Sequence, residues 1–133
     1  MKKSFFALIM LLVLSVSCEK VALPVPELSS TSYEVEVRSY SNKPAFSLEW
    51  ELSGGNAEVT KTYIQFASDK EFITPYVTSA SGNSYVVTFR DIQKMNAVFG
   101  NTEDFTLYIR LLVEGEDVQS IYSNKIKIEI DLP

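Results

Sequence analysis

Residues 105–113 have the sequence FTLYIRLLV, in which every second residue is large and apolar. Successive side chains of a β-strand point to opposite faces, so this period places one row of apolar side chains on a buried face. Thr106, Tyr108 and Arg110 fall on the opposite face. The stretch therefore predicts a half-buried β-strand.

The same period recurs along the chain between turn-forming residues such as Gly54-Gly55, Gly82 and Gly115. The shortest predicted strand follows Pro75, a residue suited to an edge position. The predicted strands are 33–37, 46–52, 62–67, 76–78, 84–89, 105–113 and 126–130. Seven short strands separated by turns predict an all-β fold, a seven-stranded β-sandwich.

One segment has a helical period instead. Ile92, Met95 and Phe99 recur at spacings of three and four, Asp91 can cap the start, and Gly100 can close the end. We expect one short helical turn here, before the sixth strand.

Composition narrows the possible functions. The 133 residues suit one domain, and they include no histidine and one cysteine. A Ser-His-Asp triad, a Cys-His pair, a histidine-bearing zinc site and an intramolecular disulfide are thereby excluded. With 12 basic against 17 acidic residues, the net charge of −5 argues against nucleic-acid binding. We expect a non-enzymatic protein without a metal or cofactor.

The first seventeen residues have the features of a secretory signal peptide. Two lysines precede an apolar run over 5–14, which is too short to span a bilayer as a permanent helix. Small residues lead into Cys18, and this junction resembles the lipobox of bacterial lipoproteins, although Ser15 stands where the lipobox has an aliphatic residue. We expect cleavage before Cys18 and its lipidation, which would anchor the chain. An ordinary secretory signal with a chance cysteine is the alternative.

The residues that follow Cys18 are predicted to form an extended tether. They include Pro24 and Pro26 and end in a run of serine and threonine, and proline holds the backbone extended. The predicted organisation is a signal peptide over 1–17, a lipidated cysteine and tether over 18–32, and one domain over 33–133.

Four stretches together resemble the amino-terminal immunoglobulin-like domain of SusE-type outer-membrane lipoproteins, accessory proteins of glycan utilisation. They are 46–50, which ends in Trp50; 63–66, followed by Phe72; 84–100; and 122–124. The first is shared with fibronectin type III domains. The resemblance spans about residues 18–133 and implies an immunoglobulin-like, fibronectin III-like sandwich.

The resemblance also implies a location and partners. We expect a lipoprotein in the outer membrane of a Gram-negative bacterium, at the cell surface rather than the periplasmic face. Its partners would be a TonB-dependent transporter and a SusD-like glycan-binding protein. Family members continue into modules that hold starch, whereas this sequence ends at Pro133. No carbohydrate-binding residue is therefore carried over, and a spacer or accessory role is expected.

Tyrosines are the candidate contacts for a polysaccharide or a partner protein. Tyr108 falls on the polar face of its strand, and Tyr122 and Tyr76 fall near strand ends. Cross-strand packing is the alternative for each. Trp50 alternates with Phe46 and is predicted to lie in the core.

Neighbouring carboxylates carry no predicted chemistry. Glu34 with Glu36, and Glu49 with Glu51, share a strand face at about 7 Å, whereas glycosidase acids face each other across a substrate. The acidic turn at 114–117 lacks the spacing of a calcium loop. Three functions remain: a SusE-like accessory subunit, direct glycan binding through tyrosines, and an adhesion or envelope-assembly subunit unrelated to glycans.

Overall fold

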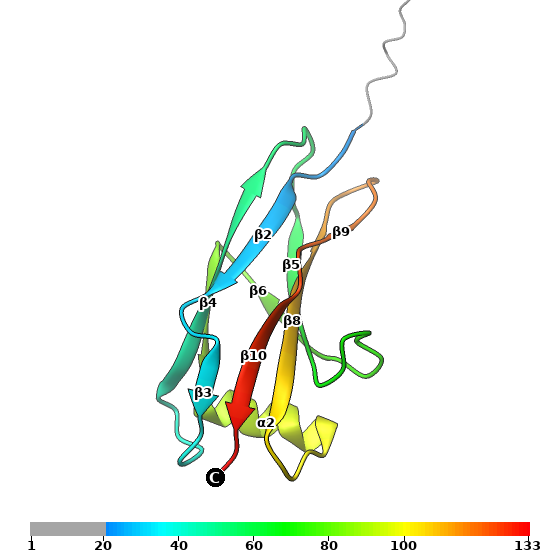
Figure 1. Ribbon diagram of the computed structural model, residues 1–133. Helices are drawn as coiled ribbons and strands as arrows, with labels where there is room; N and C mark the ends of the chain where they lie inside the picture. The colour runs from blue at the N-terminus through cyan, green and yellow to red at the C-terminus, as the bar shows by residue number, and fades with distance from the viewer. Residues whose placement is uncertain (1–20) are drawn as a thin grey trace, which may run out of the picture.

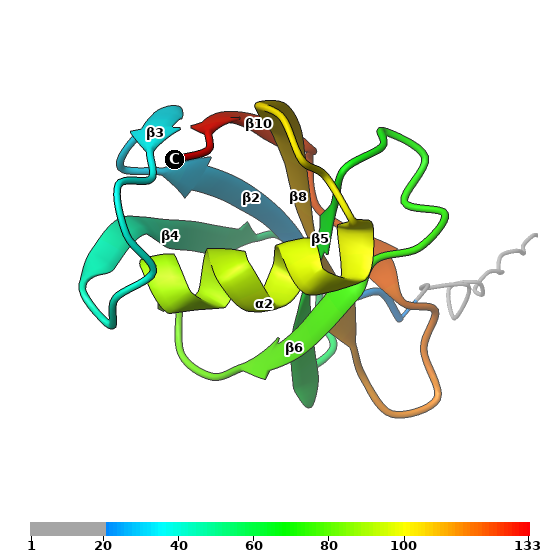
Figure 2. The same ribbon diagram turned by 90° about the horizontal axis from the view of Figure 1, so that it is seen from below.

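The observed architecture is the predicted β-sandwich. The computed structural model describes residues 21–133, which form a three-stranded and a six-stranded sheet (Figure 1) with one helix across one end (Figure 2). The elements are β2 Val25–Ser30, β3 Glu34–Glu36, β4 Pro44–Ser53, β5 Lys61–Ala67, β6 Tyr76–Ala80, β7 Ser84–Thr88, α2 Phe89–Phe99, β8 Phe105–Glu114, β9 Ile121–Tyr122 and β10 Ile126–Asp131.

The chain passes repeatedly from one sheet to the other. The smaller sheet has the order β2-β4-β7, and the larger has the order β3-β10-β8-β5-β6, with β9 also paired to β8. All pairs are antiparallel except β3 with β10. The chain enters at the end that holds the β4–β5 turn, and Pro133 lies at the opposite end near α2 (Figure 1).

The core lies between the two sheets, where the predicted alternation is observed. Four inward residues of β8 have no exposed surface: Leu107, Ile109, Leu111 and Val113. Trp50 of β4 faces them from the smaller sheet and is 3% exposed, so its predicted core position is confirmed. Burial of large apolar side chains on both inner faces is what holds the sheets together.

The tether predicted over 18–32 is wrong from residue 22 onward. Ala22 N donates to Asn56 Oδ1 at 2.9 Å, and the Ala22 carbonyl accepts from Asn56 N and Ala57 N at 2.9 and 3.0 Å. Strand β2 then pairs with β4 along its whole length. Pro26 and Leu28 are buried, so this segment follows the strand period, and proline is tolerated because β2 is an edge strand.

Two further differences concern the strands. Within the described residues there are nine strands rather than seven, because β2 and the two-residue β9 were not predicted. Strand β3 is shorter than the predicted 33–37, and Tyr33 is 48% exposed instead of facing the core. A two-residue strand carries too little pattern to be recognised from sequence.

The helix is longer than the predicted single turn and starts earlier. It has 11 residues, and its N-cap is Thr88 rather than Asp91. Asp91 occupies the third helical position and completes a capping box: Asp91 N donates to Thr88 Oγ1 at 3.1 Å, and Thr88 N donates to Asp91 Oδ2 at 2.9 Å. Gly100 closes the helix with φ 77°, as predicted.

The docked arm at residues 22–24 depends on Gly55, and Gly54 beside it offers a matched control. Both glycines have positive φ, but a Cβ at Gly55 would lie 2.4 Å from Pro24 N, whereas one at Gly54 meets nothing within 4 Å. We expect Gly54→Ala to lower the free energy of unfolding by about 1–2 kcal/mol through the left-handed backbone alone. Gly55→Ala should lower it clearly further, as measured by urea denaturation. Equal losses would contradict the docking of the arm.

Candidate functional site

The candidate site is the outer face of the six-stranded sheet. Because the odd-numbered residues of β8 face the core, Tyr108 and Arg110 face outward. The strand register places Gln65 of β5 opposite Arg110. It also places Tyr122 of β9 opposite Leu112, on the same outer face. Three strands thus supply side chains to one surface.

Arg110 lies at the centre of this surface, between two aromatic rings. Its guanidinium carbon is 4.2 Å from the centre of the Phe72 ring and 3.9 Å from that of Tyr122. Arg110 Nε also donates to Gln65 Oε1 at 2.7 Å. Two cation–π contacts and a hydrogen bond at one edge hold the planar group in a fixed orientation.

The loop that follows β5 brings Phe72 to Arg110. The Asp69 carboxylate accepts from Glu71 N at 3.1 Å and from Ile73 N at 3.2 Å, which folds the loop back on itself. Phe72 has φ 55°, unusual for a bulky residue, and is only 6% exposed. The burial of its ring thus accompanies a strained backbone.

The structure separates the three candidate tyrosines. Tyr108 is half-buried, with Ala67 opposite it on β5 and Lys127 opposite it on β10. Tyr122 is 49% exposed and covers Arg110. Tyr76 instead faces the inside of the sandwich, where its ring centre is 6.3 Å from that of Phe66. Two of the three candidates therefore flank Arg110, and Tyr76 is a contact of the core.

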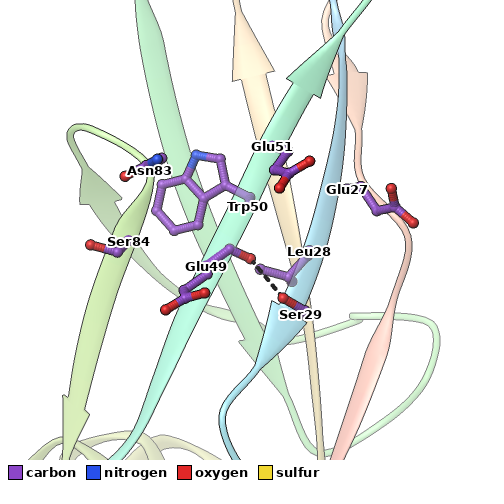
Figure 3. Close-up of a pocket in the computed structure, with 8 residues that line it drawn as sticks. All are labelled: Glu27, Leu28, Ser29, Glu49, Trp50, Glu51, Asn83 and Ser84. Atoms are coloured by element: carbon purple, nitrogen blue, oxygen red, sulfur yellow. Dashed lines mark hydrogen bonds between the residues drawn. The ribbon is translucent and has the colours of Figure 1, made fainter.

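A hollow of about 530 Å³ lies on the other sheet (Figure 3). Outward side chains of β2 and β4 line it, among them Glu27, Glu49 and Glu51. Glu27 stands directly opposite Glu51 in the strand register, so two like charges are neighbours. Trp50 and Leu28 also line the hollow but have little exposed surface. The hollow therefore offers carboxylates and hydroxyls rather than aromatic rings.

The other acidic residues named from the sequence lie apart from this hollow. Glu34 and Glu36 are on β3, and Glu36 forms an exposed ion pair with Arg38 at 3.2 Å. Asp104, which lies just before β8, is a further acid away from the hollow, and its carboxylate accepts from Leu132 N at 2.8 Å. Over residues 21–133, no group of three His, Cys, Asp or Glu side chains has the arrangement of a metal site.

The predicted signal peptide and the predicted lipidation site at Cys18 lie outside the described residues. From residue 21 onward, none of the helical structure has the length and apolar character required to cross a bilayer. Comparison with models of known protein families and with curated proteins found no match to this chain.

Arg110 is the residue of this surface that the sequence pattern did not identify as a candidate. Its position facing outward was predictable from the alternation in β8. Its two stacking partners were not, because Phe72 and Tyr122 come from separate segments that only the tertiary fold brings together. An outward arginine on a strand near aromatic residues is a common pattern. It does not by itself show which aromatic rings contact the arginine.

We predict that Phe72→Ala destabilises the fold while Ile73→Ala does not. Phe72 is 6% exposed and Ile73 is 78% exposed, although they are neighbours in one loop. Truncation of a buried phenylalanine costs about 3–5 kcal/mol, whereas a surface change costs less than about 0.5 kcal/mol. Chemical denaturation measures both. Similar values for the two variants would show that the Phe72 ring is not a packing contact.

Proposed function

We propose that this chain is a lipid-anchored, non-enzymatic accessory protein of the bacterial outer membrane. It would be a SusE-like module that works beside a glycan-uptake complex, with a TonB-dependent transporter and a SusD-like protein as partners. The observation that carries this proposal is the close spacing of the predicted lipid anchor and the folded domain. Cys18 directly follows the predicted export signal over 1–17, and Ala22 is already hydrogen-bonded to the folded domain.

The docked arm at residues 22–24 determines how far from the membrane, and in which orientation, such a module would be held. Four backbone steps separate Cys18 from Ala22, a reach of at most about 14 Å. The lipid would therefore hold the sandwich close to the membrane, with the β4–β5 turn facing it. The end that carries α2 and Pro133 would point away (Figure 1). A short linker would thus join the lipid to the domain, in place of the long proline-containing tether predicted from the sequence.

The strand order supports an immunoglobulin-like, fibronectin III-like sandwich within this proposal. Strands β2, β4 and β7 occupy the places of A, B and E, and β5, β8 and β10 those of C, F and G. The chain crosses between sheets after β4 and returns for β7, as in a Greek key. This is the fold that the SusE-type resemblance implies.

The motif residues of that resemblance act at structural junctions. Asn124 Oδ1 accepts from Leu28 N at 2.7 Å, and Asn124 Nδ2 donates to the Leu28 carbonyl at 3.0 Å, which ties the smaller sheet to the larger one. Ser123 Oγ accepts from Leu111 N at 2.7 Å. Both hydrogen-bonded residues therefore have a structural role that supports the fold assignment.

Direct contact with a glycan is the second candidate function. The observation that favours it is the group of Tyr108, Tyr122 and Arg110 on one open sheet face. Tyrosine rings and a fixed guanidinium are groups that can stack on and hydrogen-bond to sugars.

The anchor is tested by replacing Cys18. We expect Cys18→Ala to move the protein from the membrane fraction to the soluble fraction and to abolish incorporation of labelled palmitate. Ser17→Ala is the control, because it keeps a small residue before the cysteine. If Cys18→Ala stays in the membrane pellet, the chain is not anchored through this residue.

The partners are tested by purification of the native lipoprotein from detergent-solubilised outer membrane, with mass spectrometry of the proteins that accompany it. We expect a TonB-dependent transporter and a SusD-like protein in stoichiometric amounts. Recovery of adhesin or envelope-assembly components instead, or of no stoichiometric partner, would contradict a role in glycan uptake.

A further inference from the structure

We propose that Arg110 is the centre of a binding site for the carboxylate groups of an acidic polysaccharide. The proposal rests on the second candidate function, direct glycan contact, and specifies the chemical class of the glycan. It starts from the hydrogen-bond donors of Arg110. Nε is satisfied by Gln65, but neither Nη atom has a hydrogen-bond partner among residues 21–133. Neither Nη atom is fully buried, so each keeps some contact with solvent.

Within residues 21–133, Arg110 has no ion-pair partner. The single ion pair in the described part of the chain joins Arg38 to Glu36, beside the edge strand β3 and not on β8. Two of the acids on this side of the molecule are engaged elsewhere: Asp69 accepts from backbone N–H groups of its own loop, and Glu129 Oε1 accepts from Thr106 Oγ1 at 2.9 Å. Glu71, next to Phe72, is exposed and forms no ion pair within residues 21–133. The Arg110 guanidinium is half-buried, and its Nη donors are not paired with a carboxylate of the described residues. These donors can therefore bind an external anion, and the planar geometry of the guanidinium matches that of a carboxylate.

Lysines surround this position although the protein is acidic. Residues 21–133 contain nine lysines and arginines, and four of them gather here: Lys70, Arg110, Lys125 and Lys127. Lys127 faces outward opposite Tyr108. Lys125 Nζ lies 5.6 Å from the centre of the Phe72 ring and donates to the Lys70 carbonyl at 2.9 Å. The outward side chains of the opposite sheet include Glu27, Glu49 and Glu51 but no cation. The outward rows of β8 and β10 also carry Glu114, Glu129 and Asp131, so positive charge on these two strands is confined to the area around Arg110.

The form of the surface favours an extended polymer with sugar rings. The site lies on the outer face of the six-stranded sheet, where Tyr122 contacts the guanidinium and Tyr108 is two residues from Arg110 on the same face of β8. An aromatic ring beside a fixed arginine can stack on a pyranose while the arginine binds the carboxylate of that sugar or the next one. An acidic peptide would use the cations but would not need the rings.

The test is affinity electrophoresis of the intact lipoprotein in detergent through gels with defined polymers. The probes are polygalacturonate, the same polymer with its carboxyl groups methyl-esterified, neutral dextran and polyglutamate. We expect binding to polygalacturonate to be at least about tenfold tighter than to the ester, because charge-assisted hydrogen bonds are lost on esterification. The ligand changes and the protein does not, so folding cannot confound this comparison.

Variants locate the site. Arg110→Lys keeps the charge but loses the fork, and we expect about tenfold weaker binding of polygalacturonate. Lys127→Gln and Tyr122→Ala should also weaken binding. The matched controls are Lys94→Gln, on α2, and Tyr33→Ala. Both residues are exposed and lie outside the proposed site, so these two variants should bind as the unchanged protein does. Thermal unfolding confirms that each variant is folded.

Each other outcome overturns the proposal in a different way. Equal binding of the acidic and the esterified polymer, or binding that Arg110→Lys leaves unchanged, would overturn the Arg110 site while direct glycan contact stands. Binding to polyglutamate as tight as to polygalacturonate would indicate an acidic protein partner instead. Retardation by no polymer would overturn both the site and direct glycan contact. The anchoring and the partners are judged by separate measurements.

Discussion

Strand β8 holds the molecule together through the strict alternation of its side chains. Its odd-numbered residues fill the core, and its backbone pairs with β5 on one side and with β10 and β9 on the other. The same alternation that buries Ile109 turns Arg110 to the surface. A register slip of one residue would expose the core row and bury a charge. The alternation of β8 therefore determines both which of its side chains fill the core and which lie in the candidate site.

Sequence reasoning reached the fold through period and turn residues, and it failed where the pattern was short or ambiguous. The alternation in β4, β8 and β10 predicted a sandwich, and Gly100 predicted the end of α2. Strand β2 was missed because Pro26 suggested a spacer, although an edge strand accepts proline. Thr88 was missed as the N-cap because the apolar period of α2 begins several residues later.

The candidate site was only partly accessible to the same reasoning. The outward position of Tyr108 followed from period two. The inward position of Tyr76 did not, because the parity of a short edge strand depends on its register with β5. The stack on Arg110 joins segments far apart in sequence, and no local pattern encodes it. A single sequence therefore reveals the rows of apolar residues that become buried. Which surface side chains meet depends on the tertiary fold and is not encoded in a local pattern.

The docking of residues 22–24 against Gly55 also limits where an anchored molecule could search. With so few free backbone steps after the proposed lipid, the domain would sweep a small hemisphere above the bilayer and diffuse mainly within its plane. Encounters would then be two-dimensional, and a partner resident in the same membrane would experience a high effective concentration of this domain. A soluble protein farther from the surface would gain no such advantage.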